Sequence, residues 1–203
     1  MKLLTIDTDQ GDHPGIIVGD DKVLDLTKAP GSVFNDSWRP TSIREILELG
    51  DSALEQIRQI ADTVETNMDA AGAALSPLSE TSLSPPVPDP WVIFSVGMNY
   101  GRHLAEMGNT PRPPHPAGFI KTRDSLLGSG KAIHVPPQCP NKIDYEGEFC
   151  FVFGKECHRV TEAEAMHYVA GYTIAIDVSA RDWIPDIKAG DPPFGPIHGW
   201  ERN

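Results

Sequence analysis

Short apolar runs separated by turn residues mark the first 27 residues and predict a small sheet. Apolar side chains gather at positions 3–6, 15–18 and 23–26. The pair Asp20–Asp21 lies between the last two runs, where acidic residues favour a turn. This part of the chain is therefore expected to begin with three short strands.

Beyond this sheet, the spacing of apolar positions changes to a helical period and predicts two helices. Ser42 and Glu45 have the spacing of a capping box, and Gly50 is a natural stop for the first helix. Ser52 and Glu55 have the same capping-box spacing and are expected to begin a second, longer helix. Sheet and helices together predict a small N-terminal α/β domain over residues 1–75.

The segment 76–90 is rich in proline and serine, lacks helical periodicity, and is predicted to be a linker. After it, a second domain is expected over residues 91–203. Its β-like runs are at 91–97, 118–121, 131–135, 146–154 and 171–178. Thr161 and Glu164 are expected to cap the one good helix among them. The fold class is therefore α+β.

Carboxylates stand at two places on these predicted strands. Because strand side chains alternate between faces, Glu146 and Glu148 share one face. Gly147 and the three phenylalanines after Glu148 form the other face, which is predicted to be core. Asp177 ends a strand that otherwise carries no charge. Three acid oxygens of this kind suit a hard cation such as Mg²⁺, Mn²⁺ or Ca²⁺. The alternative is that the glutamates face solvent on an edge strand and that Asp177 is a turn former.

A histidine and a glutamate occur three residues apart in the segment SVGMNYGRHLAEMG. On a helix, His103 and Glu106 lie on the same face, where a carboxylate can orient an imidazole for general acid–base catalysis. Tyr100 lies just before them, at the exit of a predicted strand, and is a candidate donor to substrate. The alternative is a surface or helix-capping His–Glu pair and a packing role for the tyrosine.

Composition narrows the class of protein. With 17 Lys and Arg against 29 Asp and Glu, the formal net charge is −12, which argues against non-specific nucleic-acid binding. There are 3 cysteines without a CxxC pair, as expected of reduced thiols in the cytosol. No stretch has the length of a transmembrane helix, and the N-terminus does not resemble a signal peptide. A cytoplasmic protein without membrane or nucleic-acid partners is expected.

Four blocks of sequence together resemble the fumarylacetoacetate hydrolase family over about residues 91–183. They are SVGMNYGRHLAEMG, PAGFIKTRDSLLGSGKAIHVPP, KIDYEGEFCFVFGKECHRV and EAMHYVAGYTIAIDVSARDW. The resemblance implies a β-rich roll that is usually dimeric, with metal ligands at Glu146, Glu148 and Asp177. It further implies a catalytic His103–Glu106 dyad, and Mg²⁺ is the expected ion.

The resemblance also implies substrate contacts from Lys121, Arg123 and Arg181. Members of the family hydrolyse carbon–carbon bonds of acylpyruvate- or fumarylacetoacetate-like acids, decarboxylate oxaloacetate-like acids, or isomerise 2-hydroxy-diene dioates from aromatic catabolism. These reactions share an enolate, which a metal stabilises while a histidine moves a proton. A small anionic oxo-acid is therefore the expected substrate, and a homodimer the expected assembly.

The sequence departs from the family pattern near its end. Trp183-Ile184-Pro185 stands where the family often has a glutamine, and the chain ends close to where a further site lysine is expected. A C-terminally truncated, partial catalytic domain is therefore expected. Two other functions stay open: an incomplete fragment that binds metal or pairs with a full-length homologue, and a purely structural metal-binding domain.

Overall fold

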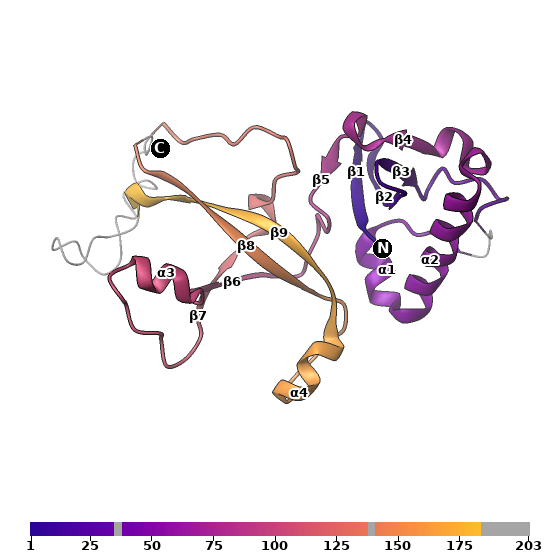
Figure 1. Cartoon of the computed structure of the whole chain (residues 1–203). Helices are drawn as coiled ribbons and strands as arrows, with labels where there is room; N and C mark the ends of the chain where they lie inside the picture. The colour runs from indigo at the N-terminus through magenta and orange to yellow at the C-terminus, as the bar shows by residue number, and fades with distance from the viewer. Residues whose placement is uncertain (35–37, 138–140, 184–203) are drawn as a thin grey trace. The chain divides into compact units, whose positions relative to one another are not determined.

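A computed structural model describes residues 1–34, 38–137 and 141–183 of the chain (Figure 1). The chain divides into two compact units, a first unit Met1–Gly130 and a second unit from Lys131 onward. Within the described ranges, no helix is both long enough and apolar enough to cross a membrane. The expectations about Ile184, Pro185 and the end of the chain lie outside the described residues.

The first unit begins with an antiparallel sheet of five strands in the order β4-β3-β2-β1-β5. The strands are β1 (Leu3–Thr8), β2 (Gly11–Val18), β3 (Lys22–Asp25), β4 (Leu75–Pro77) and β5 (Leu83–Ser84). The three predicted N-terminal strands are confirmed. The last two strands come from or border the predicted linker 76–90, so the start of that segment pairs with the sheet edges. Its role as a domain boundary stays a prediction.

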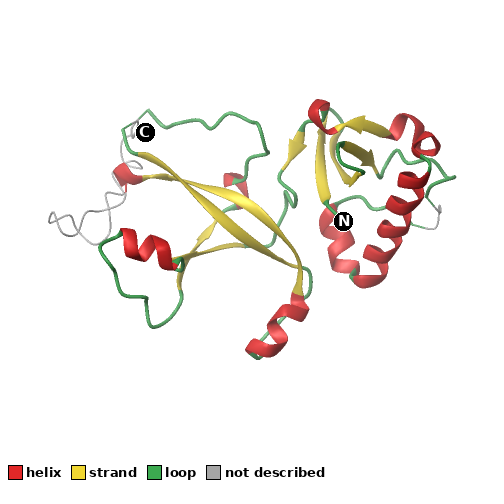
Figure 2. Ribbon diagram, viewed as in Figure 1, coloured by secondary structure: helices red, strands yellow, loops and turns green. Residues whose placement is uncertain are grey.

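Two helices of the first unit, α1 (Ile43–Leu49) and α2 (Asp51–Thr66), contact strands of this sheet (Figure 2). Their apolar faces are fully buried at Ile46 and Ile57. The Ser42 cap is confirmed, because its Oγ accepts a hydrogen bond from the Glu45 amide at 3.0 Å. The capping box at Ser52 is wrong: α2 begins at Asp51, directly after Gly50, and has no side-chain cap. Gly50, with φ 73°, joins the two helices and leaves Ser52 inside the first turn.

The remainder of the first unit contains a second, smaller pairing of strands. β6 (Ile93–Gly97) and β7 (Ala117–Lys121) are antiparallel, and α3 (Gly101–Glu106) lies between them in sequence. Both strands were predicted. The described residues also form short 3-10 helices. In the first unit these are η1 (Met68–Ala74), η2 (Leu78–Glu80) and η3 (Arg123–Ser125), and in the second unit η4 (Met166–Tyr168) and η5 (Arg181–Trp183).

The second unit is built on one long antiparallel ribbon, β8 (Ile143–Phe153) with β9 (Val169–Ala180). Between them lies α4 (Glu162–Ala165), whose predicted capping box of Thr161 and Glu164 is confirmed. The predicted strand at 131–135 is wrong: this segment forms no strand in the part of the chain that the structure describes, and Ile133 is 53% exposed. A β-like composition does not make a strand without a neighbouring backbone to pair with.

The prediction that the phenylalanines of the ribbon form a core is wrong, because their side chains are exposed. Phe149, Phe151 and Phe153 are 54%, 49% and 59% exposed, and Tyr172 beside them is 54% exposed. These four residues are called the aromatic face below. The Phe149 and Tyr172 rings stack with centroids 5.3 Å apart. The reason for the exposure is architectural, since within the described part of the second unit no second layer packs on this side of a two-stranded ribbon.

Candidate metal centre and catalytic residues

The ribbon brings the three predicted carboxylates together on the side opposite the aromatic face. Glu146 stands directly across from Asp177 in the strand register, and Glu148 is two residues further along β8 on the same side. One carboxylate oxygen from each residue lies within 4.8 Å of the others. The cluster therefore depends on both alternation and register, because opposite residues of paired strands point to the same face.

The burial of these acids favours a ligand over the alternative of solvent-facing acids. Asp177 is 8% exposed, and both glutamates are half-buried. Like charges directly opposite each other on a ribbon repel, and partial burial adds a desolvation cost. A cation roughly 2.1 to 2.6 Å from each donor can join oxygens up to about 5 Å apart, so the observed separation fits. An all-oxygen set suits Mg²⁺, Mn²⁺ or Ca²⁺.

A positive side chain already contacts this cluster. The Arg181 guanidinium forms ion pairs with Glu146 and with Asp144. Burial alone would lower the pKa of Arg181, but the hydrogen bonds and charges of the two acids outweigh it and raise this pKa. Arg181, predicted as a substrate contact, is therefore held as a permanent cation beside the acidic cluster.

Cys150 follows the two glutamates on the same face of β8 and is half-buried. Burial raises the pKa of its thiol, and the nearby charge of Glu148 raises it further. A thiol with a raised pKa stays protonated at neutral pH and is a poor nucleophile or metal ligand. Among the described residues, the ligand atoms that come together are carboxylate oxygens of Glu146, Glu148 and Asp177, without the Cys150 thiol.

The predicted dyad lies in the first unit, on α3. His103 and Glu106 are both exposed, and neither side chain makes a hydrogen bond or ion pair with the described residues. The segment does form the helix on which the proposed His103–Glu106 pairing depends, and Leu104 on it is buried. Met98, just before this helix, has φ 55°, a left-handed backbone conformation that is strained for a residue with a side chain. The catalytic role of the dyad stays a prediction.

The other predicted substrate contacts of the first unit lie on and around β7 and α3. Tyr100 is the N-cap residue of α3 and is 40% exposed. Lys121 ends β7, with its Nζ 5.6 Å from the centroid of the Phe119 ring. Arg123 begins η3 and is exposed. Tyr100 and Arg123 are thus exposed and Lys121 is half-buried, while the roles of all three stay predictions.

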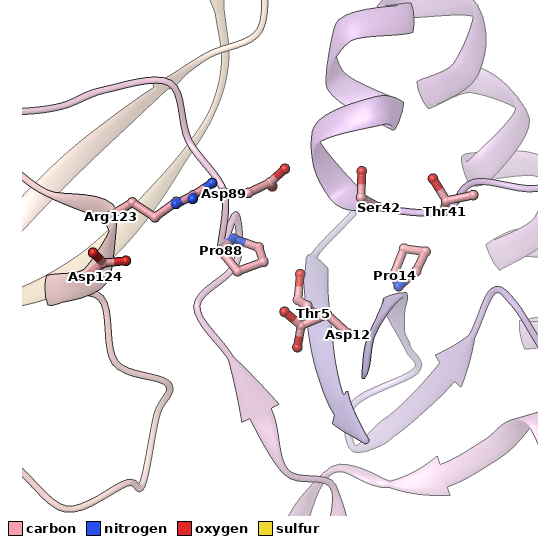
Figure 3. Close-up of a pocket in the computed structure, with 9 residues that line it drawn as sticks. All are labelled: Thr5, Asp12, Pro14, Thr41, Ser42, Pro88, Asp89, Arg123 and Asp124. Carbon is pink, nitrogen blue, oxygen red and sulfur yellow. The ribbon is translucent and has the colours of Figure 1, made fainter. Parts of the chain in front are cut away.

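Arg123 also lines a cavity of about 440 Å³ within the first unit (Figure 3). The other lining residues are Thr5, Asp12, Pro14, Thr41, Ser42, Pro88, Asp89 and Asp124. Two of its acids have a partner: Asp89 Oδ2 pairs with Arg44 at 2.8 Å, and Asp12 accepts a hydrogen bond from the Ser84 hydroxyl at 2.6 Å. With three aspartates against one arginine, this cavity is poorly suited to an anionic oxo-acid.

Sequence reasoning missed one residue of the acidic side of the ribbon. Asp144 lies two residues before Glu146 and therefore on the same face, and it accepts hydrogen bonds from Arg181. The alternation that identified the two glutamates would have found it. The strand was instead expected to begin at residue 146, whereas β8 begins at Ile143.

Comparisons with known proteins agree with the family resemblance. Residues 92–199 match the family described as Fumarylacetoacetate (FAA) hydrolase C-terminal. The oxaloacetate tautomerase YisK of Bacillus subtilis is 35% identical over 170 residues, which are 83% of this chain and 56% of that protein. The mitochondrial oxaloacetate tautomerase fahd2 of Xenopus laevis is 40% identical over 148 residues, 73% of this chain and 43% of that protein.

The fold is also found among solved structures. A probable 2-hydroxyhepta-2,4-diene-1,7-dioate isomerase from Mycobacterium abscessus matches with a TM-score of 0.62 and 27% sequence identity. The match covers 96% of this chain and 58% of that one. The chain thus spans about half the length of the curated relatives it matches.

Proposed function

The chain belongs to the fumarylacetoacetate hydrolase family, and from this premise we propose that it binds a divalent cation at Glu146, Glu148 and Asp177 and acts on a small 2-oxo acid. The observation that carries the proposal is the convergence of three carboxylate oxygens within 4.8 Å on a ribbon whose other residues are largely apolar. Mg²⁺ is the proposed ion, and Mn²⁺ or Ca²⁺ would suit the same donors.

A bound divalent cation would supply Lewis-acid stabilisation of the enolate charge that develops on the substrate. The protein would supply proton transfer and anion binding. In the proposed roles, His103 moves a proton at the carbon next to the oxo group, and Glu106 orients its imidazole. The substrate carboxylates would be held by the accessible polar side chains Tyr100, Lys121, Arg123 and Arg181.

Tautomerisation of an oxaloacetate-like acid is the reaction that the relatives favour. The proteins of B. subtilis and X. laevis are both oxaloacetate tautomerases. In this reaction a proton leaves the C3 carbon and another is taken up by the oxo oxygen, so no bond between heavy atoms breaks. Carbon–carbon hydrolysis and decarboxylation instead start from the oxo form and release an enolate as the carbon–carbon bond breaks, and the proposed cation site would stabilise that charge in the same way. A homodimer in the cytoplasm is the proposed assembly and location.

A second candidate function is supported by the exposed aromatic face. A metal-binding chain that pairs with a full-length homologue would cover such a face on assembly. The two functions differ in the behaviour of the isolated protein, because only the first gives turnover without an added homologue.

The proposal is tested by measuring Mn²⁺ binding by calorimetry and oxaloacetate tautomerisation by the ultraviolet absorbance of the enol. We expect Glu148→Gln to weaken Mn²⁺ binding by at least about 100-fold, because it removes one of three charged ligands. His103→Ala should retain Mn²⁺ binding while lowering the rate about 10²- to 10⁴-fold. His115→Ala, another exposed histidine of the first unit, is the control and should change neither. Full turnover after removal of divalent metal would contradict the proposal.

A further inference from the structure

Arg181 is fixed at the end of the ribbon by its backbone as well as by its side chain. Its amide donates to the Lys142 carbonyl at 2.8 Å, where β9 leads into η5. The next residue, Asp182, accepts hydrogen bonds from the amides of Asn141 and Lys142 at 3.2 and 3.1 Å. Hydrogen bonds therefore fix the backbone at Arg181 to the residues just before β8.

The guanidinium divides its donors between two acids of β8. Its Nε donates to Asp144 Oδ2 at 3.1 Å, and its Nη2 lies 3.0 Å from the same oxygen. Nη2 also donates to Glu146 Oε1. Asp144 and Glu146 are two residues apart on the same face of the strand, which is the spacing that allows one planar guanidinium to bridge them.

This bridge conflicts with a cation at the acidic cluster. Glu146 is one of the three clustered acids, and one of its two carboxylate oxygens is engaged by Arg181. A divalent ion bound there would face a fixed positive charge that shares a ligand with it. A cation at the cluster would therefore compete with Arg181 for the charge of the Glu146 carboxylate.

Asp144 is a second carboxylate partner for the Arg181 guanidinium. Both Nε and Nη2 of Arg181 contact Asp144, which lies outside the clustered set. If Glu146 is withdrawn, Nε and Nη2 keep their Asp144 contacts, and the fork geometry holds the plane of the guanidinium. Arg181 then stays beside the cluster, with freed hydrogen-bonding capacity.

We propose that Arg181 is an internal counter-ion of the acidic cluster, exchanged for the metal at Glu146, and that Asp144 is the positioning residue that retains the guanidinium during this exchange. The inference rests on the proposed function, because it assumes that the cluster binds a divalent ion. It adds that metal affinity is set by competition with an arginine. The carboxylates are thereby partly neutralised before metal binds, and the affinity for metal is lower than three acids alone would give.

The first test is Mn²⁺ binding to the full chain by calorimetry, without substrate. Arg181→Gln removes the competing charge and should lower the Mn²⁺ dissociation constant about tenfold. The control is Lys142→Gln, which removes one positive charge from an exposed side chain that makes no ion pair with the described residues. This control should change the constant less than about twofold.

The second test is a double-mutant cycle with Asp144→Asn, which leaves Arg181 with Glu146 as its remaining partner among the two acids. Stronger competition should raise the Mn²⁺ dissociation constant about threefold. In the Arg181→Gln background the same change at Asp144 should have little effect, because no guanidinium is left to position. Thermal unfolding without metal checks that each variant is folded.

The outcomes separate the inference from the proposed function. The proposed metal site is wrong if the unaltered chain binds no Mn²⁺. It is also wrong if the Glu148→Gln variant binds Mn²⁺ as tightly as the unaltered chain does. If Mn²⁺ binds and needs Glu148, but Arg181→Gln matches the Lys142→Gln control, the counter-ion inference is overturned. An equal effect of Asp144→Asn with and without Arg181 would show that Asp144 acts by its own charge, and would overturn its positioning role.

Discussion

Apolar side chains are buried in the first sheet but exposed to solvent on the β8–β9 ribbon. Ile16, Leu24 and Ile57 in and against the sheet are fully buried. On the ribbon, Ile174 is 81% exposed and Phe149 is 54% exposed. The strands of both contain many residues of high strand propensity, β-branched in the sheet and both β-branched and aromatic in the ribbon, so strand propensity alone does not separate them. The difference comes from α1 and α2, which provide the sheet with a second layer.

The two regions therefore have different expected roles, the sheet in the stability of the fold and the ribbon in metal binding. The N-terminal sheet carries the continuous core, whereas the ribbon carries the acidic cluster on one side and the aromatic face on the other. We therefore expect substitutions in the first region to act mainly on the free energy of unfolding, and substitutions on the acidic side of the ribbon to act mainly on metal binding.

The largest expected difference comes from matched phenylalanine substitutions in the two regions. Phe34 is 0% exposed, and Phe34→Ala should lower the free energy of unfolding by about 3 to 5 kcal/mol through lost burial and a cavity. Phe151 is 49% exposed, and Phe151→Ala should lower it by less than about 1 kcal/mol. Chemical denaturation of both variants measures the contrast. Equal losses would mean that the aromatic face is covered in the protein in solution.

A smaller effect is expected from Asp25, a buried acid of the first sheet. Burial by itself would raise its pKa, but hydrogen bonds from Thr27, His13 and Lys28 outweigh this and lower it. A lowered folded-state pKa contributes stability that is fully present above the unfolded value of about 4 and is lost as the pH falls through the folded-state value. Asp25→Asn should therefore cost about 1 to 3 kcal/mol at pH 7.

The pH dependence sharpens this comparison between regions. The deficit of Asp25→Asn should shrink as the pH is lowered from about 5 towards about 2, because the unaltered carboxylate is also being protonated. Glu156→Gln, at an exposed acid of the second unit without a partner among the described residues, is the control and should show no such trend. Unfolding by urea across this pH range provides the measurement. A deficit that does not change with pH would contradict the assignment.

The smallest effects are expected at the helix caps of the two regions. Ser42→Ala should destabilise by about 1 kcal/mol, because it leaves the Glu45 amide without its hydrogen bond at the start of a packed helix. Thr161→Ala, at the exposed single turn α4, should cost less than about 0.5 kcal/mol. Ser52→Ala should be nearly neutral because Ser52 caps nothing, and thermal unfolding can rank all three. A Ser52 effect as large as that of Ser42 would contradict the observed start of α2.

The acidic cluster could be predicted from sequence because it depends on a period of two, which is visible in each strand separately. Glu146, Glu148 and Asp177 needed only the correct face of each strand and an antiparallel pairing. The spacing of His103 and Glu106 could likewise be predicted, but not whether their side chains meet. That depends on rotamers and tertiary neighbours, and spacing on a six-residue helix does not determine either.

The errors arose where the local pattern depends on a neighbour. Residues 131–135 resemble a strand, but a strand needs a partner backbone that sequence does not reveal. Ser52 has cap spacing, but Gly50 joins two helices directly and shifts the start of α2. Phe149 resembles a core residue, yet its exposure depends on what packs over the ribbon. Asp144 was missed because the strand start, an unreliable boundary, was placed too late.

The pairing of Glu146 with Asp177 makes the acidic cluster a reporter of strand alignment. A slip of one residue along the ribbon would bring Ile176 or Val178 opposite Glu146 and turn Asp177 towards the aromatic side. Of these alignments, only the native one brings the three acids together. An ion that requires all three would therefore bind the native alignment and stabilise it against the slipped ones. Metal binding would in this way select the native strand register before any substrate binds.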